Sequence, residues 1–267
     1  MAITTIDGII AGAKPPKPYH KALSGALIAG RPFSPFYTPG IPGAAVAPSP
    51  GIAGAALTSY PGQISFPTIA SGKRYLSRFL GQATINGTLL LCDRLWHNSG
   101  ITITSATAQT INSAAWPARD SNAATSGEDV LIGLEVSAVT GAGTPTLTLS
   151  YTNSAGTAGK TGVNTVATSA TSAVGAFFPI GLAAGHVGVQ SIQTYTQSAT
   201  WTSGTVHLVA YRILAALELN NANTGNAIDA LTGGFPELFA NTVPFLLFIP
   251  STTTTSNIFA EVSYADG

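Results

Sequence analysis

The chain has 267 residues, of which only 8% are charged, and its formal net charge at pH 7 is zero. Charged residues usually make up about a quarter of a globular domain, so the composition is unusual for a freely diffusing enzyme and suits a protein covered by neighbours. The single cysteine, Cys92, excludes an internal disulfide, and no apolar run is long enough for a membrane-spanning helix.

The N-terminal region is rich in proline. Eleven of the seventeen prolines lie before residue 70, in runs such as PPKP, RPFSPF and TPGIPG. Proline removes a backbone donor and is excluded from helix interiors and central strands. We therefore predict that residues 1–72 form an extended arm without a core of its own. The aromatic residues of this region argue against plain disorder, so we expect another subunit to hold the arm.

Charge divides the chain in the same way. Residues 1–80 carry seven basic residues and one acidic residue, whereas residues 81–267 carry four basic and ten acidic residues. A basic arm and an acidic body predict contact between copies or with another acidic subunit, although scattered lysines can also simply keep a tail soluble. The residues predicted to bind a partner are Lys14, Lys17, Lys21, Arg31, Phe33, Phe36, Tyr37, Phe66, Lys73, Arg74 and Arg78.

The remainder, residues 73–267, has the pattern of β-strands. In DVLIGLEVSA, Val130, Ile132, Leu134 and Val136 alternate with a second set that includes Glu135, which we place on the outer face. TLTLSYT repeats the alternation, and TVHLVAYRIL alternates with both faces half apolar. Many short strands with turn residues between them predict an all-β sandwich, either a jelly roll or immunoglobulin-like. Short helical turns are expected around residues 214–240.

No motif indicates enzyme chemistry. GTAGKTG (156–162) lacks the first glycine of a phosphate-binding loop and is followed by a strand-like segment, so we predict a hairpin turn. His20, His97, His186 and His207 have no metal-ligand spacing. Seven cations over 80 residues are too few to favour nucleic-acid binding. We predict no catalytic residue, no metal site and no cofactor.

Three segments resemble a known group of proteins. TLLLCDRLWHNSGI (88–101), GEDVLIGLEVSAVTGAGTPTLTLSYTNSAGTAG (127–159) and SATWTSGTVHLVAYR (198–212) resemble virion structural proteins of tailed bacteriophages. The resemblance covers most of residues 73–267 and implies a particle component on or in the head, without supplying a catalytic residue. Because the start of the chain lacks the pattern of a secretory signal, we expect assembly in the host cytoplasm and a final location in the virion.

Three functions follow as hypotheses. The first is a capsid decoration or minor capsid protein, forming homo-oligomers and stabilising the head by laying its arm on the major capsid protein or another virion subunit. The second is a structural protein of the tail, collar or baseplate. The third is a module that binds carbohydrate or a host surface, for which Trp116, Trp201 and Tyr195 would supply exposed aromatic rings.

Overall fold

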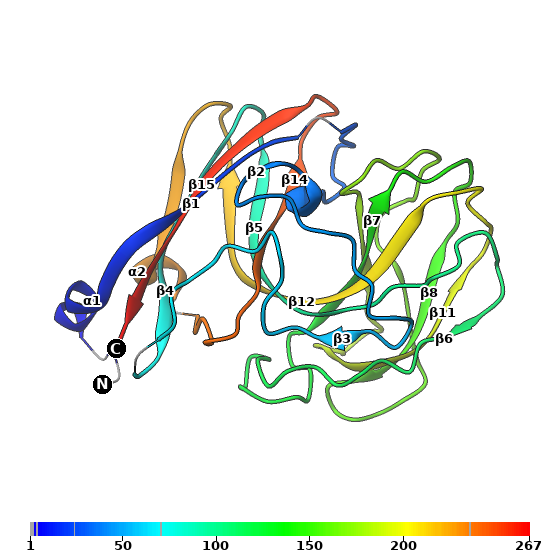
Figure 1. Cartoon of the computed structure of the whole chain (residues 1–267), viewed down its shortest axis with the longest axis horizontal. Helices are drawn as coiled ribbons and strands as arrows, with labels where there is room; N and C mark the ends of the chain where they lie inside the picture. Colours follow the sequence, from blue (N-terminus) through cyan, green and yellow to red (C-terminus); the bar gives the residue numbers. More distant parts are fainter. Residues whose placement is uncertain (1–2, 4, 24, 70, 235) are drawn as a thin grey trace.

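The computed structural model describes residue 3 and residues 5–23, 25–69, 71–234 and 236–267. Within these residues the chain is almost entirely β-structure, and its strands form two antiparallel sheets, the larger of which curls into a half-barrel (Figure 1). The predicted all-β sandwich class is therefore confirmed.

The smaller sheet has five strands in the order β13-β4-β15-β1-β2. It joins the two ends of the sequence, because β1 pairs along its length with β15. The strands are β1 (Ala13–Leu23), β2 (Gly40–Ile41), β4 (Arg74–Ala83), β13 (Asn226–Asp229) and β15 (Ser256–Asp266).

The larger sheet runs in the order β14-β5-β12-β7-β10-β9-β8-β11-β6, and β3 pairs with β5 beside this path. Its strands are β3 (Ala55–Ala56), β5 (Gly87–His97), β6 (Gln109–Thr110), β7 (Leu131–Ala138), β8 (Leu147–Asn153), β9 (Lys160–Asn164), β10 (Phe177–Gly181), β11 (Val189–Gln197), β12 (Thr205–Leu219) and β14 (Pro244–Pro250). Strands β8 and β9 form the hairpin predicted at 156–162.

The described residues form few helices, and these are short. They are α1 (Ile6–Gly12), the 3₁₀ helix η1 (Pro35–Tyr37) and α2 (Ala230–Gly233). The helical turns expected around residues 214–240 reduce to α2, because residues 214–219 continue β12, where Leu214, Leu217 and Leu219 are buried.

The core has three parts. One lies between the five-stranded sheet and β14-β5-β12, and a second fills the half-barrel. The third covers the opposite face of the larger sheet, where Phe36 of η1 packs with Phe177, Tyr211 and Phe245. Both faces of the central strands are therefore buried, which explains why both faces of β12 are half apolar in sequence.

The proline-rich segment differs from the predicted arm, because it folds onto its own chain. Figure 1 shows β1 lying along β15. Strand β2 pairs with β1 only at His20 and Lys21, so the N-terminal half of β1 is a sheet edge. Pro15 and Pro16 fall where the register of β1 with β15 is irregular. Proline is tolerated at sheet edges and irregularities, and it prevents another strand from pairing. The region predicted to be extended also contains α1 and η1, and the partner of its longest strand, β1, is β15 of the same chain.

Candidate functional site

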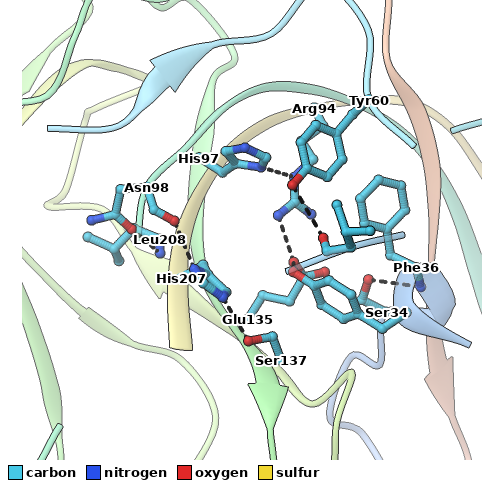
Figure 2. Close-up of polar contacts among 12 residues, drawn as sticks. Ser34, Phe36, Tyr60, Arg94, His97, Asn98, Glu135, Ser137, His207 and Leu208 are labelled. Carbon is cyan, nitrogen blue, oxygen red and sulfur yellow. Dashed lines mark hydrogen bonds and ion pairs between the residues drawn. The ribbon is translucent and has the colours of Figure 1, made fainter. Parts of the chain in front are cut away.

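A closed polar centre lies where the N-terminal segment covers β5 and β7 (Figure 2). Arg94 of β5 donates from Nη2 to Glu135 Oε2 of β7 at 2.7 Å, and both side chains are fully buried. The rings of Phe36 and Phe245 flank the guanidinium, with centroids at 4.9 and 5.6 Å from its carbon. Glu135 is thus not on an outer face, because residues 34–37 cover it.

The N-terminal segment contributes directly to this centre. The Tyr37 hydroxyl donates to Glu135 Oε2 at 2.9 Å. Burial would raise the pKa of the Glu135 carboxyl, but the charge of Arg94 and hydrogen bonds from Arg94 and Tyr37 hold it below its ordinary value. Burial and the negative charge of Glu135 raise the pKa of Tyr37 well above normal. The hydrogen bond from Tyr37 to the Arg94–Glu135 ion pair therefore holds η1 against the larger sheet.

Two histidines extend the polar centre. Arg94 Nε donates to His97 Nδ1 at 3.2 Å, which requires this nitrogen to be unprotonated. Burial, the charge of Arg94 and neighbouring His207 lower the pKa of His97 to about 2. His207 contacts Asn98 O at 2.8 Å and Ser137 Oγ at 2.7 Å, and burial lowers its pKa as well. Two neutral, fully packed imidazoles support a structural role in place of proton transfer with a substrate.

A second buried ion pair, Arg119–Asp93, holds the long connection between β6 and β7 against β5. Arg119 donates from Nε and Nη2 to the two carboxylate oxygens of Asp93 at 2.9 and 3.1 Å, and from Nη1 to Leu57 O at 2.8 Å. Asp93 also accepts the Val243 amide at 2.9 Å. One guanidinium thus links three segments that are far apart in sequence.

Lys21 is a buried cation that has no carboxylate partner in the described part of the chain. Its ammonium group donates to Phe36 O at 3.2 Å and Gly43 O at 3.4 Å, and its side chain is 1% exposed. Burial lowers the pKa of Lys21 to about 8 from 10.5. The folded chain therefore loses this proton at lower pH than the unfolded chain, so the cost of the charge is greatest below pH 8 and fades as the pH rises toward 10.5.

We expect Lys21→Met to raise the free energy of unfolding at pH 7 by about 1–3 kcal/mol, because methionine keeps the apolar stem and removes the buried charge. The gain should shrink as the pH rises from 8 to 10. The two carbonyl oxygens that lose the lysine donor still have partners. Phe36 O continues to accept the Ala45 amide, and Gly43 is exposed to water. Chemical denaturation across this range measures the effect, with exposed Lys14→Met as the control; a loss of stability in Lys21→Met would contradict the interpretation.

The other residues predicted to bind a partner are buried, paired within the chain, or left at least partly exposed. Arg31, Phe33, Phe36 and Arg74 are buried with Lys21 inside the chain, so this fold does not present them to a neighbour. Arg74 pairs with Asp266 at 2.7 Å, and Lys73 pairs with Glu237 at 2.6 Å. The predicted attraction of basic to acidic residues is thus partly satisfied within one molecule. Those left at least partly exposed without an ion pair among the described residues are Lys14, Lys17, Tyr37, Phe66 and Arg78.

The surface required for the carbohydrate-binding alternative is not formed by the residues proposed for it. Trp116, Trp201 and Tyr195 are at most 2% exposed. Within the described ranges, no group of three or more His, Cys, Asp or Glu side chains could hold a metal ion. The same part of the chain has no helix that combines the length and apolar character needed to span a membrane. Cys92 is buried.

Comparisons with known proteins yield little. No family model and no curated protein matches the chain. Among solved structures, the chain aligns over 95% of its length with 82% of a chain in the infectious bursal disease virus Gt strain, at 11% identity and a TM-score of 0.20. The VP2 subviral particle of the same virus aligns with similar coverage, at 9% identity and a TM-score of 0.19. Scores this low do not establish a shared fold.

Proposed function

We propose that the chain is a structural subunit of a virus particle, of the tailed-bacteriophage kind whose virion proteins its sequence resembles. The observation that carries the proposal is the placement of charge. Nine of the chain's eleven basic and eleven acidic side chains are buried: Lys21, Arg31, Arg74, Asp93, Arg94, Arg119, Asp120, Glu135 and Arg212. Thirteen charged side chains are left for a surface of 10490 Å².

Such a surface favours association. Soluble domains generally keep their charge outside, where about a quarter to a third of surface residues are charged and prevent precipitation. In this chain nine charged side chains lie in the interior instead, where they hold the N-terminal segment and the long connections in place. The outside is small, polar and weakly charged, and it can be covered by neighbours at little cost in desolvation.

Within the particle, we place the chain on the capsid as a decoration or minor capsid protein, with the major capsid protein and further copies of itself as partners. It reinforces the shell by packing as a preformed β unit, and it does not act as an enzyme or bind nucleic acid. Because five of the eleven arm residues are buried within the chain, the contacts with neighbours fall to the exposed faces of the sandwich. A position in the tail, collar or baseplate is the second candidate.

Quantitative mass spectrometry of purified particles tests this proposal. We expect the chain to co-purify with infectious particles through a density gradient, at a fixed ratio to the major capsid protein. On the order of hundreds of copies per particle indicates a shell, whereas about 3 to 12 copies indicate a vertex, collar or baseplate. If the chain is abundant in infected cells and absent from washed particles, the proposal is wrong.

A further inference from the structure

Residues 58–63 form a short flap between two anchored residues. Leu57 and Ile64 are at most 6% exposed, and their amides donate to carbonyl groups of β5 and β14 at 2.8 and 3.0 Å. Among the described residues, the only hydrogen bond from the flap to another segment joins the Tyr60 hydroxyl to Val46 O, at 3.3 Å. The flap can therefore move while both of its ends stay in place.

Tyr60 is the part of the flap that covers the polar centre. Figure 2 shows its ring beside Arg94 and His97. The rings of Tyr60 and His97 meet edge to face with their centroids 4.6 Å apart, and Phe36 lies on the other side at 6.1 Å. His97 is only 2% exposed, whereas Tyr60 is half-buried. Displacing Tyr60 would therefore open the imidazole and the neighbouring guanidinium to water.

The hydrogen bonding of His97 excludes a second proton while the flap is closed. Its Nδ1 accepts from Arg94 Nε at 3.2 Å, so the proton of the neutral ring lies on Nε2. A second proton would have to bind Nδ1, where it would point at the N–H group of the guanidinium. His97 can become charged only if the contact with Arg94 is broken.

The surroundings of His97 also oppose a positive charge. The charged and titratable groups around the ring are Arg94 on β5, His207 on β12, Glu135 on β7, Tyr37 on η1 and Tyr60 on the flap. Glu135 is the one carboxylate of this group, and it is already paired with Arg94. Burial, Arg94 and His207 lower the pKa of His97 to about 2, whereas an imidazole in water titrates near 6.5.

We infer that the flap is an acid-sensitive gate: in mild acid, protonation of His97 displaces Tyr60 and admits water to the Arg94–Glu135 ion pair. The open state binds one more proton than the closed state, so each pH unit below about 6.5 favours opening about tenfold. Because Glu135 is the acceptor for Tyr37, water at the ion pair also loosens η1. The gate belongs to a single chain and goes beyond the proposed function, so neither depends on the other.

Hydrogen exchange of the arginine side chains, followed by NMR, tests the gate. The Nε–H group of Arg94 lies in the closed centre and exchanges only when water reaches it. We expect its protection, measured relative to exposed Arg78, to fall roughly 25-fold between pH 7 and pH 5. Arg119 is buried, and its Nε is bonded to Asp93 outside the flap. Its protection should stay constant and serves as the internal control.

Three variants and one wild-type measurement locate the effect. His97→Asn keeps an acceptor near Nδ1 and removes the titration, so the protection of Arg94 should become independent of pH in this range. Tyr60→Ser should lower that protection roughly tenfold already at pH 7, whereas Ser59→Ala, at an exposed position of the flap, should leave it unchanged. In the wild type, nitrogen NMR of the imidazole should show a neutral His97 at pH 5.

Four results would overturn the inference. The first is a wild-type Arg94 whose protection is the same at pH 7 and pH 5, and the second is a pH dependence that persists in His97→Asn. The third is an equal fall in the protection of Arg119, which would mean that the whole chain opens. The fourth, a charged His97 in the folded wild type at pH 5, requires no variant.

Discussion

Glu135→Gln lowers the free energy of unfolding by about 3–5 kcal/mol, the effect expected when one partner of a buried ion pair is removed. Glutamine keeps the shape of the side chain and removes its charge, so Arg94 is left as a buried cation. The Tyr37 hydroxyl also loses a charged acceptor. Urea denaturation of the wild type and the variant at pH 7 measures the difference.

The double variant Arg94→Met with Glu135→Leu distinguishes the effect of an unpaired charge on stability from a general loss of packing. Among the residues that the structure describes, Arg94 Nη1 and Glu135 Oε1 have no hydrogen-bond partner, so the pair is not fully compensated for leaving water. Replacing both by apolar residues of similar size should therefore recover most of the loss. Equal stability of wild type and Glu135→Gln, within about 1 kcal/mol, would contradict the role given to this pair.

Arg119→Met should cost a similar amount, about 3–5 kcal/mol, because Asp93 then keeps only the Val243 amide in a buried site. Leu57 O also loses its donor from Arg119. An unpaired buried carboxylate favours protonation, so the deficit of the variant should shrink as the pH is lowered from 7 to 5. Unfolding curves at the two pH values measure this change.

Arg78→Met is the matched control, since Arg78 is exposed and outside the ion pairs. We expect its stability to stay within about 0.5 kcal/mol of the wild type. Arg119→Lys should recover only part of the loss, because a single ammonium group cannot reproduce the two parallel bonds to Asp93. A deficit in Arg119→Met that grows on acidification would contradict the account of Asp93.

The alternation of apolar residues was enough to predict the strands of the body. Val130, Ile132, Leu134 and Val136 all point into the half-barrel and are at most 1% exposed. The same pattern could not show that the other face of β7 is also covered, because the cover comes from residues about a hundred positions earlier. Glu135 therefore looked like a surface residue, although it is the acceptor for both Arg94 and Tyr37.

Proline content indicated an extended N-terminal region, and it identified neither the helix at Ile6–Gly12 nor the partner of β1. A proline-rich strand at a sheet edge and an arm reaching another subunit share the same backbone geometry and the same lack of donors. Two contacts distinguish these possibilities: the pairing of β1 with β15 and the packing of Phe36 against the larger sheet. Both involve residues near the C-terminal end of the chain, in β15 and at Phe245. One signal was present: the half-apolar second face of β12 indicated that something must cover it.

The central claim is that the chain is a particle subunit that folds its proline-rich segment onto itself. A cryo-electron microscopy map of purified particles, at a resolution that traces backbones, tests it most directly. We predict density for many copies, each with β1 between β2 and β15 of the same molecule and η1 on its own larger sheet. A particle whose density is fully assigned to other chains, or copies whose residues 13–66 lie on a neighbouring subunit, would contradict it.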